Sequence, residues 1–140
     1  MTLGVEKSVT DQHLIFIDRQ GSGRIRPDTW EAYAARPENV ILCTFRTARN
    51  NIIALSASIL EGRSCTKTIT IVHKQYRKRG LGSLVLQLRL NLLPDYDICT
   101  IVAEDNIASN RLVSKCGMNK VGEQEQERKS GTYKALIYKT

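Results

Sequence analysis

The sequence contains no long apolar segment. Its longest purely apolar runs are about four residues, as in Val40–Cys43, whereas a helix that spans a bilayer needs about 20. The first residues, MTLGVEKSVTD, show no basic stretch followed by an apolar block, which is the pattern of a secretory signal. We therefore expect a cytoplasmic protein that does not enter a membrane.

Closely spaced metal ligands are also missing. The two histidines, His13 and His73, do not cluster with the cysteines. Four cysteines are scattered along the chain without a CxxC pair: Cys43, Cys65, Cys99 and Cys116. Because zinc sites need close ligand pairs, we predict no metal. The cysteines are interpreted as reduced, mostly buried thiols that pack as small hydrophobic groups.

Neither of the common nucleotide-binding glycine motifs, GxxxxGK[ST] and GxGxxG, occurs in the chain. The informative glycines follow a cationic stretch in Val72–Ser83 (VHKQYRKRGLGS). The run that leads into it, Lys67–Val72, is rich in β-branched residues, as in a strand, and apolar residues recur at helical spacing from Leu81 to Leu92. A strand, a loop and the start of a helix are predicted, and the free N–H groups of such a helix start bind a diphosphate.

This loop resembles the V-x-P-x-Y-R-G-x-G-x-G segment of the GCN5-related N-acetyltransferases. The matching residues are Val72, Tyr76, Arg77, Gly80 and Gly82. Lys74 replaces the usual proline and Lys78 replaces a glycine. Both departures keep the two turn glycines and the helix start, so the resemblance stands.

A second segment, Ala103–Met118, resembles the N-x-x-[AS]-x-x-L-Y-x-K-x-G-F signature of the same family. The matching residues are Asn106, Ser109, Leu112, Lys115 and Gly117. Asp105 or Asn106 can cap the start of a helix here, and Gly117 can end it. Val113 stands where many members carry a tyrosine that protonates the leaving thiolate, and valine cannot donate a proton.

The resemblance covers about residues 66–139 and implies one α/β domain over residues 1–140. Its central mixed sheet should have about six or seven strands with helices on both faces. The strands are expected at 13–18, 40–47, 52–60, 67–72, 98–103 and, as a hairpin turning at 129–131, at 121–140. Only one short helix, Pro27–Arg36, is expected between the first two strands, so the N-terminal helical region should be abbreviated.

Acetyl-CoA is the co-substrate that the resemblance implies. Its pantetheine arm is expected in a gap between Thr68–Val72 and Ile98–Ala103, paired with the backbone of Thr70 and Val72. Asn106 should fix the arm from the opposite side. The diphosphate is expected at the loop and helix start, on Arg77, Lys78, Arg79, Gly80, Gly82 and Ser83.

The groups that move protons are harder to assign. The cofactor strand, Cys65–Thr70, lacks the glutamate that is common in the family. Glu104 or Asp105, through water, is a candidate base, and Tyr133 is a candidate acid.

Glu123, Glu125 and Glu127 alternate along a predicted strand and therefore share one face. That face is either solvated surface or an acidic patch that attracts a cationic acceptor.

The net charge of +7 fits a site for a phosphorylated cofactor and also allows contact with a polyanion. The favoured function is transfer of an acetyl group from acetyl-CoA to a primary amine, on a small molecule or a peptide, without a covalent enzyme intermediate. A non-catalytic CoA-binding module and a nucleic-acid-associated protein are the alternatives. The sequence contains no zinc finger or RNA-binding aromatic pair for the latter. A monomer and a homodimer both remain open.

Overall fold

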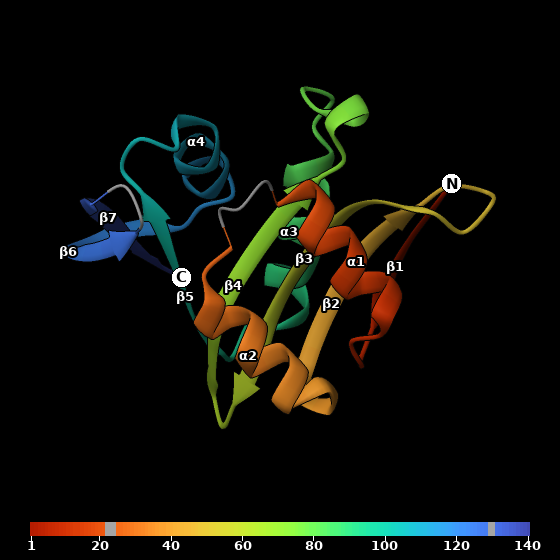
Figure 1. The fold of residues 1–140 in the computed structure, drawn as a ribbon, viewed down its shortest axis with the longest axis horizontal. Helices are drawn as coiled ribbons and strands as arrows, with labels where there is room; N and C mark the ends of the chain where they lie inside the picture. The colour runs from red at the N-terminus through yellow and green to blue at the C-terminus, as the bar shows by residue number, and fades with distance from the viewer. Residues whose placement is uncertain (22–24, 129–130) are drawn as a thin grey trace.

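In the computed structural model, which describes residues 1–21, 25–128 and 131–140, seven strands form one mixed sheet in the order β1-β2-β3-β4-β5-β7-β6 (Figure 1). The strands are β1 (Thr2–Glu6), β2 (Val40–Arg46), β3 (Ile52–Glu61), β4 (Ser64–Val72), β5 (Asp97–Ala103), β6 (Asn119–Arg128) and β7 (Gly131–Lys139). The helices are α1 (Asp11–Gln20), α2 (Pro27–Ala35), α3 (Leu81–Leu92) and α4 (Ile107–Lys115), with short 3₁₀ turns η1 (Pro37–Asn39) and η2 (Lys74–Tyr76). Within the described residues, no helix is long and apolar enough to cross a membrane.

The N-terminal region differs from the expectation. Residues 13–18 belong to α1 and not to a strand, because His13, Phe16 and Ile17 are buried at helical spacing. A short apolar run such as LIFI fits a buried strand and a buried helix face equally well, which explains the error. The first strand is β1, and both α1 and α2 precede β2. The predicted abbreviation of the N-terminal helical region is therefore wrong.

The other predicted elements are confirmed, with small shifts at their ends. β2 and β3 form the predicted antiparallel hairpin, and β6 and β7 form the last one. Two residues of the predicted final turn, Lys129 and Ser130, lie outside the described residues. The mixed α/β sheet with helices on both faces is thus the architecture that the sequence predicts.

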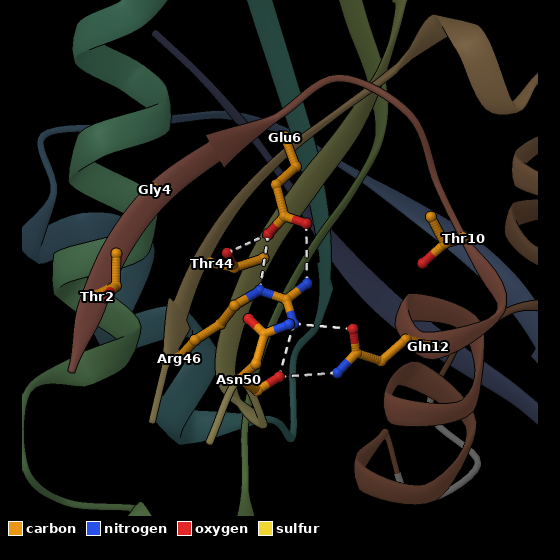
Figure 2. A pocket seen from close by; sticks show the side chains of 8 residues that line it. All are labelled: Thr2, Gly4, Glu6, Thr10, Gln12, Thr44, Arg46 and Asn50. Atoms are coloured by element: carbon orange, nitrogen blue, oxygen red, sulfur yellow. Dashed lines mark hydrogen bonds and ion pairs between the residues drawn. The ribbon is translucent and has the colours of Figure 1, made fainter. Parts of the chain in front are cut away.

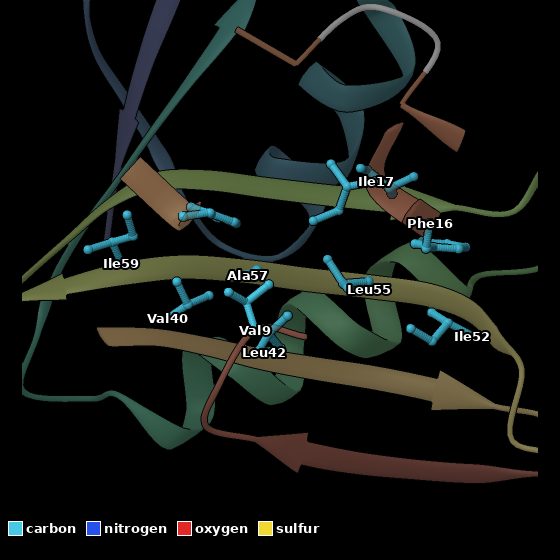
Figure 3. Packing of buried hydrophobic residues seen from close by; sticks show 11 residues of the cluster. Val9, Phe16, Ile17, Val40, Leu42, Ile52, Leu55, Ala57 and Ile59 are labelled. Atoms are coloured by element: carbon cyan, nitrogen blue, oxygen red, sulfur yellow. The ribbon is translucent and has the colours of Figure 1, made fainter. Parts of the chain in front are cut away.

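The helices divide the sheet into two faces. On the α1–α2 face, Phe16 and Ile17 pack onto Leu42, Leu55 and other buried residues of β2, β3 and β4 (Figure 3). On the α3–α4 face, a second cluster joins residues of α3 and α4 to β4, β5 and β7. Figure 1 shows α1 and α2 over β2–β4, and neither helix extends over β5–β7. Among the described residues, β5–β7 are covered by a helix on the α3–α4 face alone.

An arginine lies in the core between α3 and the sheet. Arg89 is fully buried and donates from Nε to Ser56 Oγ (2.9 Å) and from Nη1 to Ser58 Oγ (3.2 Å). Its Nη2 has no hydrogen-bond partner among the described residues. Ser56 Oγ also lies 3.0 Å from Thr70 Oγ1, so α3 is linked through β3 to β4. Burial without a carboxylate partner lowers the pKa of Arg89.

Candidate functional site

The central feature of the site is a gap between β4 and β5. These parallel strands pair only at their first residues, Ser64 with Asp97 and Cys65 with Ile98. Just beyond, the Thr68 hydroxyl donates to the Cys99 carbonyl (2.9 Å) and bridges the two strands. From there the strands part, so the facing edges, which include Thr70 and Val72, carry no pairing with each other. Two unpaired strand edges offer backbone hydrogen bonds to an extended ligand.

A bulge in β4 lies at the narrow end of this gap. The register between β3 and β4 shifts between Ala57 and Ile59, and Lys67 adopts a left-handed conformation (φ +52°). The buried Tyr33 on α2 donates its hydroxyl to the Lys67 carbonyl (2.7 Å). The bulge turns the Lys67 side chain toward α2, where its Nζ lies 2.8 Å from Asp28 Oδ2. The sequence carried no signal for this bulge, because its fixing partner comes from a distant helix.

The loop after β4 ends at the start of α3. Lys78 (φ +64°) and Gly80 (φ +80°) both have left-handed backbones, and Gly80 caps the helix. Among the described residues, no acceptor takes the backbone N–H groups from Lys78 to Ser83. Several free donors at one helix start form an anion site. The geometry therefore fits the diphosphate position that the sequence predicts.

The cations of this loop differ in their surroundings. Arg77 donates from Nε to the Val72 carbonyl (3.2 Å) and from Nη2 to the Gln20 carbonyl (3.2 Å), so it ties the loop to β4 and to α1. Arg79 lies over the Tyr76 ring, 5.4 Å from its centroid. Arg77, Lys78 and Arg79 are all exposed. Arg77 thus positions the loop and is accessible to a ligand, as are Lys78 and Arg79.

Gly82 lies where α3, α4 and β4 meet. A Cβ atom at Gly82 would lie 3.4 Å from Leu112 Cδ2 on α4 and 3.4 Å from Val72 Cγ2 on β4. The absence of a side chain therefore brings the helix start close to both neighbours. The motif predicted a turn glycine here, and the structure adds a packing reason.

The far side of the gap is organised by two asparagines. Asn106 caps α4 by accepting the Ser109 N–H on its Oδ1 (3.3 Å). Asn110 donates from Nδ2 to the Ala103 carbonyl (3.0 Å) and accepts the Tyr138 hydroxyl on Oδ1 (2.8 Å). Asn110 therefore joins the end of β5 to α4 and β7, a role that its place in the motif did not reveal. Val113 is buried in the core, so no proton donor takes the usual position of the family tyrosine.

The predicted acidic residues lie on the α3–α4 face of the final hairpin. Lys134 Nζ lies 3.0 Å from Glu123 Oε2 and 3.3 Å from Glu104 Oε2. The hydrogen bonds from Lys120 and then Lys134 lower the pKa of Glu123. The strand register pairs Glu123 with Leu136, Glu125 with Lys134 and Glu127 with Thr132. The three glutamates do share a face, as predicted, and it is the face opposite to α2.

The predicted acid, Tyr133, lies on the α1–α2 face. It pairs with Gln126 across the hairpin, and its hydroxyl donates to Gln126 Oε1. A hollow of about 720 Å³ lies beside this hairpin and is lined by Tyr133, Lys134 and neighbouring residues of both strands. The structure therefore separates Tyr133 from Glu104, which sequence reasoning had placed in one site.

A second hollow, of about 420 Å³, lies between β1, β2 and α1 (Figure 2). Its base is Glu6, which accepts from Arg46 Nη2 (2.8 Å), from Arg46 Nε (3.1 Å) and from Thr44. The Thr10 N–H donates to His13 Nδ1 (2.9 Å), so the ring proton lies on Nε2, 3.0 Å from Glu6 Oε1. Glu6, Arg46 and His13 thus interact with one another and hold β1 to β2 and α1. We call these three residues the clasp.

Burial raises the pKa of Glu6, but the hydrogen bonds from Arg46 and Thr44, with nearby positive charge, outweigh it and lower the pKa to about 2. Burial lowers the pKa of His13.

Among the described residues, no group of three or more His, Cys, Asp or Glu side chains comes together to hold a metal ion.

No family model and no curated protein sequence matches this chain. Solved structures do match it. The ribosomal-protein-S18-alanine N-acetyltransferase of Escherichia coli superposes with a TM-score of 0.77 at 16% identity, covering 99% of this chain and 92% of that one. The spermidine N-acetyltransferase of Vibrio cholerae, in complex with CoA and spermine, gives 0.75 at 17% identity, covering 99% and 94%.

A structure described as a putative phosphinothricin N-acetyltransferase gives a TM-score of 0.75 at 19% identity, covering 99% of this chain and 97% of that one. The likeness thus extends over nearly the whole length of both chains, including the N-terminal region that the sequence motifs do not reach. The parted strands, the glycine loop and the asparagine-capped helix occur in the order that the resemblance predicts. This chain therefore has the fold of the GCN5-related N-acetyltransferases.

Proposed function

We propose that the protein transfers an acetyl group from acetyl-CoA to a primary amine. The observation that carries this proposal is the gap between β4 and β5, which opens beside a helix start with free N–H groups. One feature suits an extended arm and the other suits a diphosphate, and coenzyme A has both. The fold of known N-acetyltransferases supports the same reading.

In this proposal the backbone of Thr70 and Val72 pairs with the pantetheine arm, and Asn106 contacts the arm from α4. The N–H groups around Gly80, Gly82 and Ser83 hold the diphosphate, with Lys78 and Arg79 adding charge. The protein contributes proximity by holding the thioester beside the amine, and backbone N–H groups stabilise the charge that develops on the carbonyl oxygen. The nitrogen attacks the carbonyl carbon, the C–S bond breaks, and the sulfur leaves as a thiolate that takes up a proton.

Two groups are proposed for the protons. Tyr133 is the proposed acid, and its position on the same face as α2 supports this role. Glu104 is the proposed base, acting through water, although its ion pair with Lys134 holds it on the other face. Because it lies on the face opposite to α2, Glu104 is the less favoured of the two. A cytoplasmic location is proposed together with this function.

A CoA-binding module without catalysis is the second candidate. The buried Val113 at the usual tyrosine position favours it. The two functions are separated by thiol release: an enzyme releases CoA in proportion to added amine, and a binding module releases none. The first acceptors to test are an alanine-terminated peptide and spermidine, because the names of two structural neighbours mention alanine and spermidine.

Thermal unfolding tests the cofactor site directly. At a concentration one hundred times its dissociation constant, acetyl-CoA should stabilise the fold by about 2.7 kcal/mol. Gly82→Asp should abolish this shift, because it adds a side chain and a negative charge at the diphosphate position. Gly82→Ala is the matched control: it meets the same close contacts with Leu112 and Val72 without the charge, and should retain most of the shift. An unchanged shift in Gly82→Asp would overturn the assignment of this loop.

A further inference from the structure

An acceptor can reach the gap from one face of the sheet alone. On the α3–α4 face, Ile98 and Val102 of β5 are buried against Leu86 and Val113. On the α1–α2 face, Ile101 is 44% exposed and no helix in the described part of the chain covers β5 (Figure 1). The groups that meet an incoming acceptor are therefore those on the α1–α2 face near the narrow end of the gap.

Three charges stand in a row at this place: Arg26, Asp28 and Lys67, which we call the charged strip. Arg26 Nε lies 3.2 Å from Asp28 Oδ1, and Lys67 Nζ lies 2.8 Å from Asp28 Oδ2. Asp28 is in the first turn of α2, and Lys67 is in the bulge of β4, next to Thr68 at the point where the strands part. The hydrogen bond from Lys67 lowers the pKa of Asp28, so the carboxylate stays ionised.

The strip carries one more positive than negative charge and has unused donors. Within the described chain, Nη1 and Nη2 of Arg26 and the other N–H groups of Lys67 contact no acceptor. The two side chains are 49% and 36% exposed, so a ligand can reach them. A guanidinium with two free nitrogen groups binds a carboxylate in a bidentate manner, and an ammonium beside it adds a third donor.

The acidic groups that would attract a polycation lie elsewhere. Glu104 and Glu123 are paired with Lys134 on the α3–α4 face of the hairpin. On the α1–α2 face, β5 and the final hairpin present the uncharged side chains of Ile101, Gln126 and Tyr133. The register places one carboxylate, Asp97, and one cation, Lys139, on the same face at the closed end of the gap, and their charges balance. The open face of the gap therefore favours a negative group on the acceptor and disfavours a second positive one.

We propose that the charged strip binds a carboxylate next to the acceptor's amine, so that the acceptor is a free amino acid. Arg26 and Lys67 take the carboxylate, and Asp28 holds the two cations side by side. The amino group then points from the strip toward the gap. The inference rests on the proposed acetyl transfer and adds to it the chemical class of the acceptor.

The test compares each common amino acid with its own carboxamide, which has the same amine and side chain and lacks the negative charge. Rates of thiol release from acetyl-CoA are compared per unprotonated amine, because the two amines differ in pKa. We expect the best amino acid to exceed its carboxamide in kcat/KM by about tenfold at low salt, and the preference to shrink as salt screens the charges. An equal or greater rate for carboxamides, or for spermidine, would overturn the inference.

The double variant Arg26→Gln/Lys67→Gln should reduce this preference to about unity and leave the KM for acetyl-CoA unchanged. The matched control, Lys120→Gln/Lys134→Gln, removes two cations from the α3–α4 face and should keep the preference intact. Thermal unfolding confirms that each variant is folded. Thiol release with carboxamides but no preference for amino acids refutes the strip and retains acetyl transfer. No thiol release with any amine, in a protein that acetyl-CoA stabilises, refutes both.

Discussion

The two halves of the sheet, β1–β4 and β5–β7, are built differently. Most of β3 is buried, and α1, α2 and α3 enclose it together with β2 and β4. β5 alternates between buried and accessible residues, because α4 covers one of its faces and no element of the described residues covers the other. The first half is therefore a platform whose residues serve stability. The second half leaves one face to a ligand, and its accessible residues are available for function.

The largest contrast should appear between Leu55 in β3 and Ile101 in β5. Leu55 is fully buried, so Leu55→Ala should lower the free energy of unfolding by about 2–5 kcal/mol. Ile101 is 44% exposed, so Ile101→Ala should cost less than about 1 kcal/mol and change the KM for the amine instead. Urea unfolding and steady-state kinetics measure the two effects. Equal stability losses would show that both halves serve the same purpose.

A second test concerns the buried charge within the platform. Ser56→Ala/Ser58→Ala should destabilise the protein by about 2–4 kcal/mol, because Arg89 then keeps no hydrogen-bond partner among the described residues. Adding Arg89→Met should restore part of the loss, since an apolar side chain needs no partner there. Chemical denaturation of the double and triple variants measures this. Additive losses would indicate that the arginine and the serines act independently.

The clasp at β1 should make the platform sensitive to acid. The pKa of His13 is lowered by folding, so its stabilising contribution is present above pH 6.5 and is lost as the pH falls below it. The pKa of Glu6 falls from 4.5 to about 2, so its contribution is lost as the pH falls between these values. Because the Glu6 side chain is 31% exposed, screening reduces this contribution to about 1–2 kcal/mol. Denaturation at several pH values should show both losses, and Glu6→Gln should remove the lower one.

The smallest effect is expected at the glutamates of the hairpin. Glu123→Gln, Glu125→Gln and Glu127→Gln together should change the KM for an amine by less than about twofold, because these side chains lie on the face opposite to the charged strip and are screened by salt. A large rise in the amine KM at low salt would instead show that the three glutamates attract a cationic acceptor. Unfolding of the triple variant checks that the hairpin is intact.

The sequence predicted the second half of the molecule better than the first. β4, the loop and α3 follow from local patterns: β-branched residues, two glycines and leucines at helical spacing. α1 was mistaken for a strand because its burial depends on β3 and β4, which the local pattern does not contain. Similarly, the bulge at Lys67 depends on Tyr33, and the charged strip depends on α2 meeting that bulge. Contacts between distant segments decided these features, so no local reading could find them.

The hydrogen bond from Thr68 to the Cys99 carbonyl limits how deeply a ligand can enter the gap. Between this bond and the start of the two strands, β4 and β5 are paired, so the bond closes the narrow end of the gap. In the proposed function, an acyl group carried by an arm of constant length would then always reach the same depth. An acyl group longer than acetyl would have to turn out of the plane of the sheet, toward Ile101 on the open face. The Thr68 hydroxyl would thereby set which acyl chains compete with the acceptor for space.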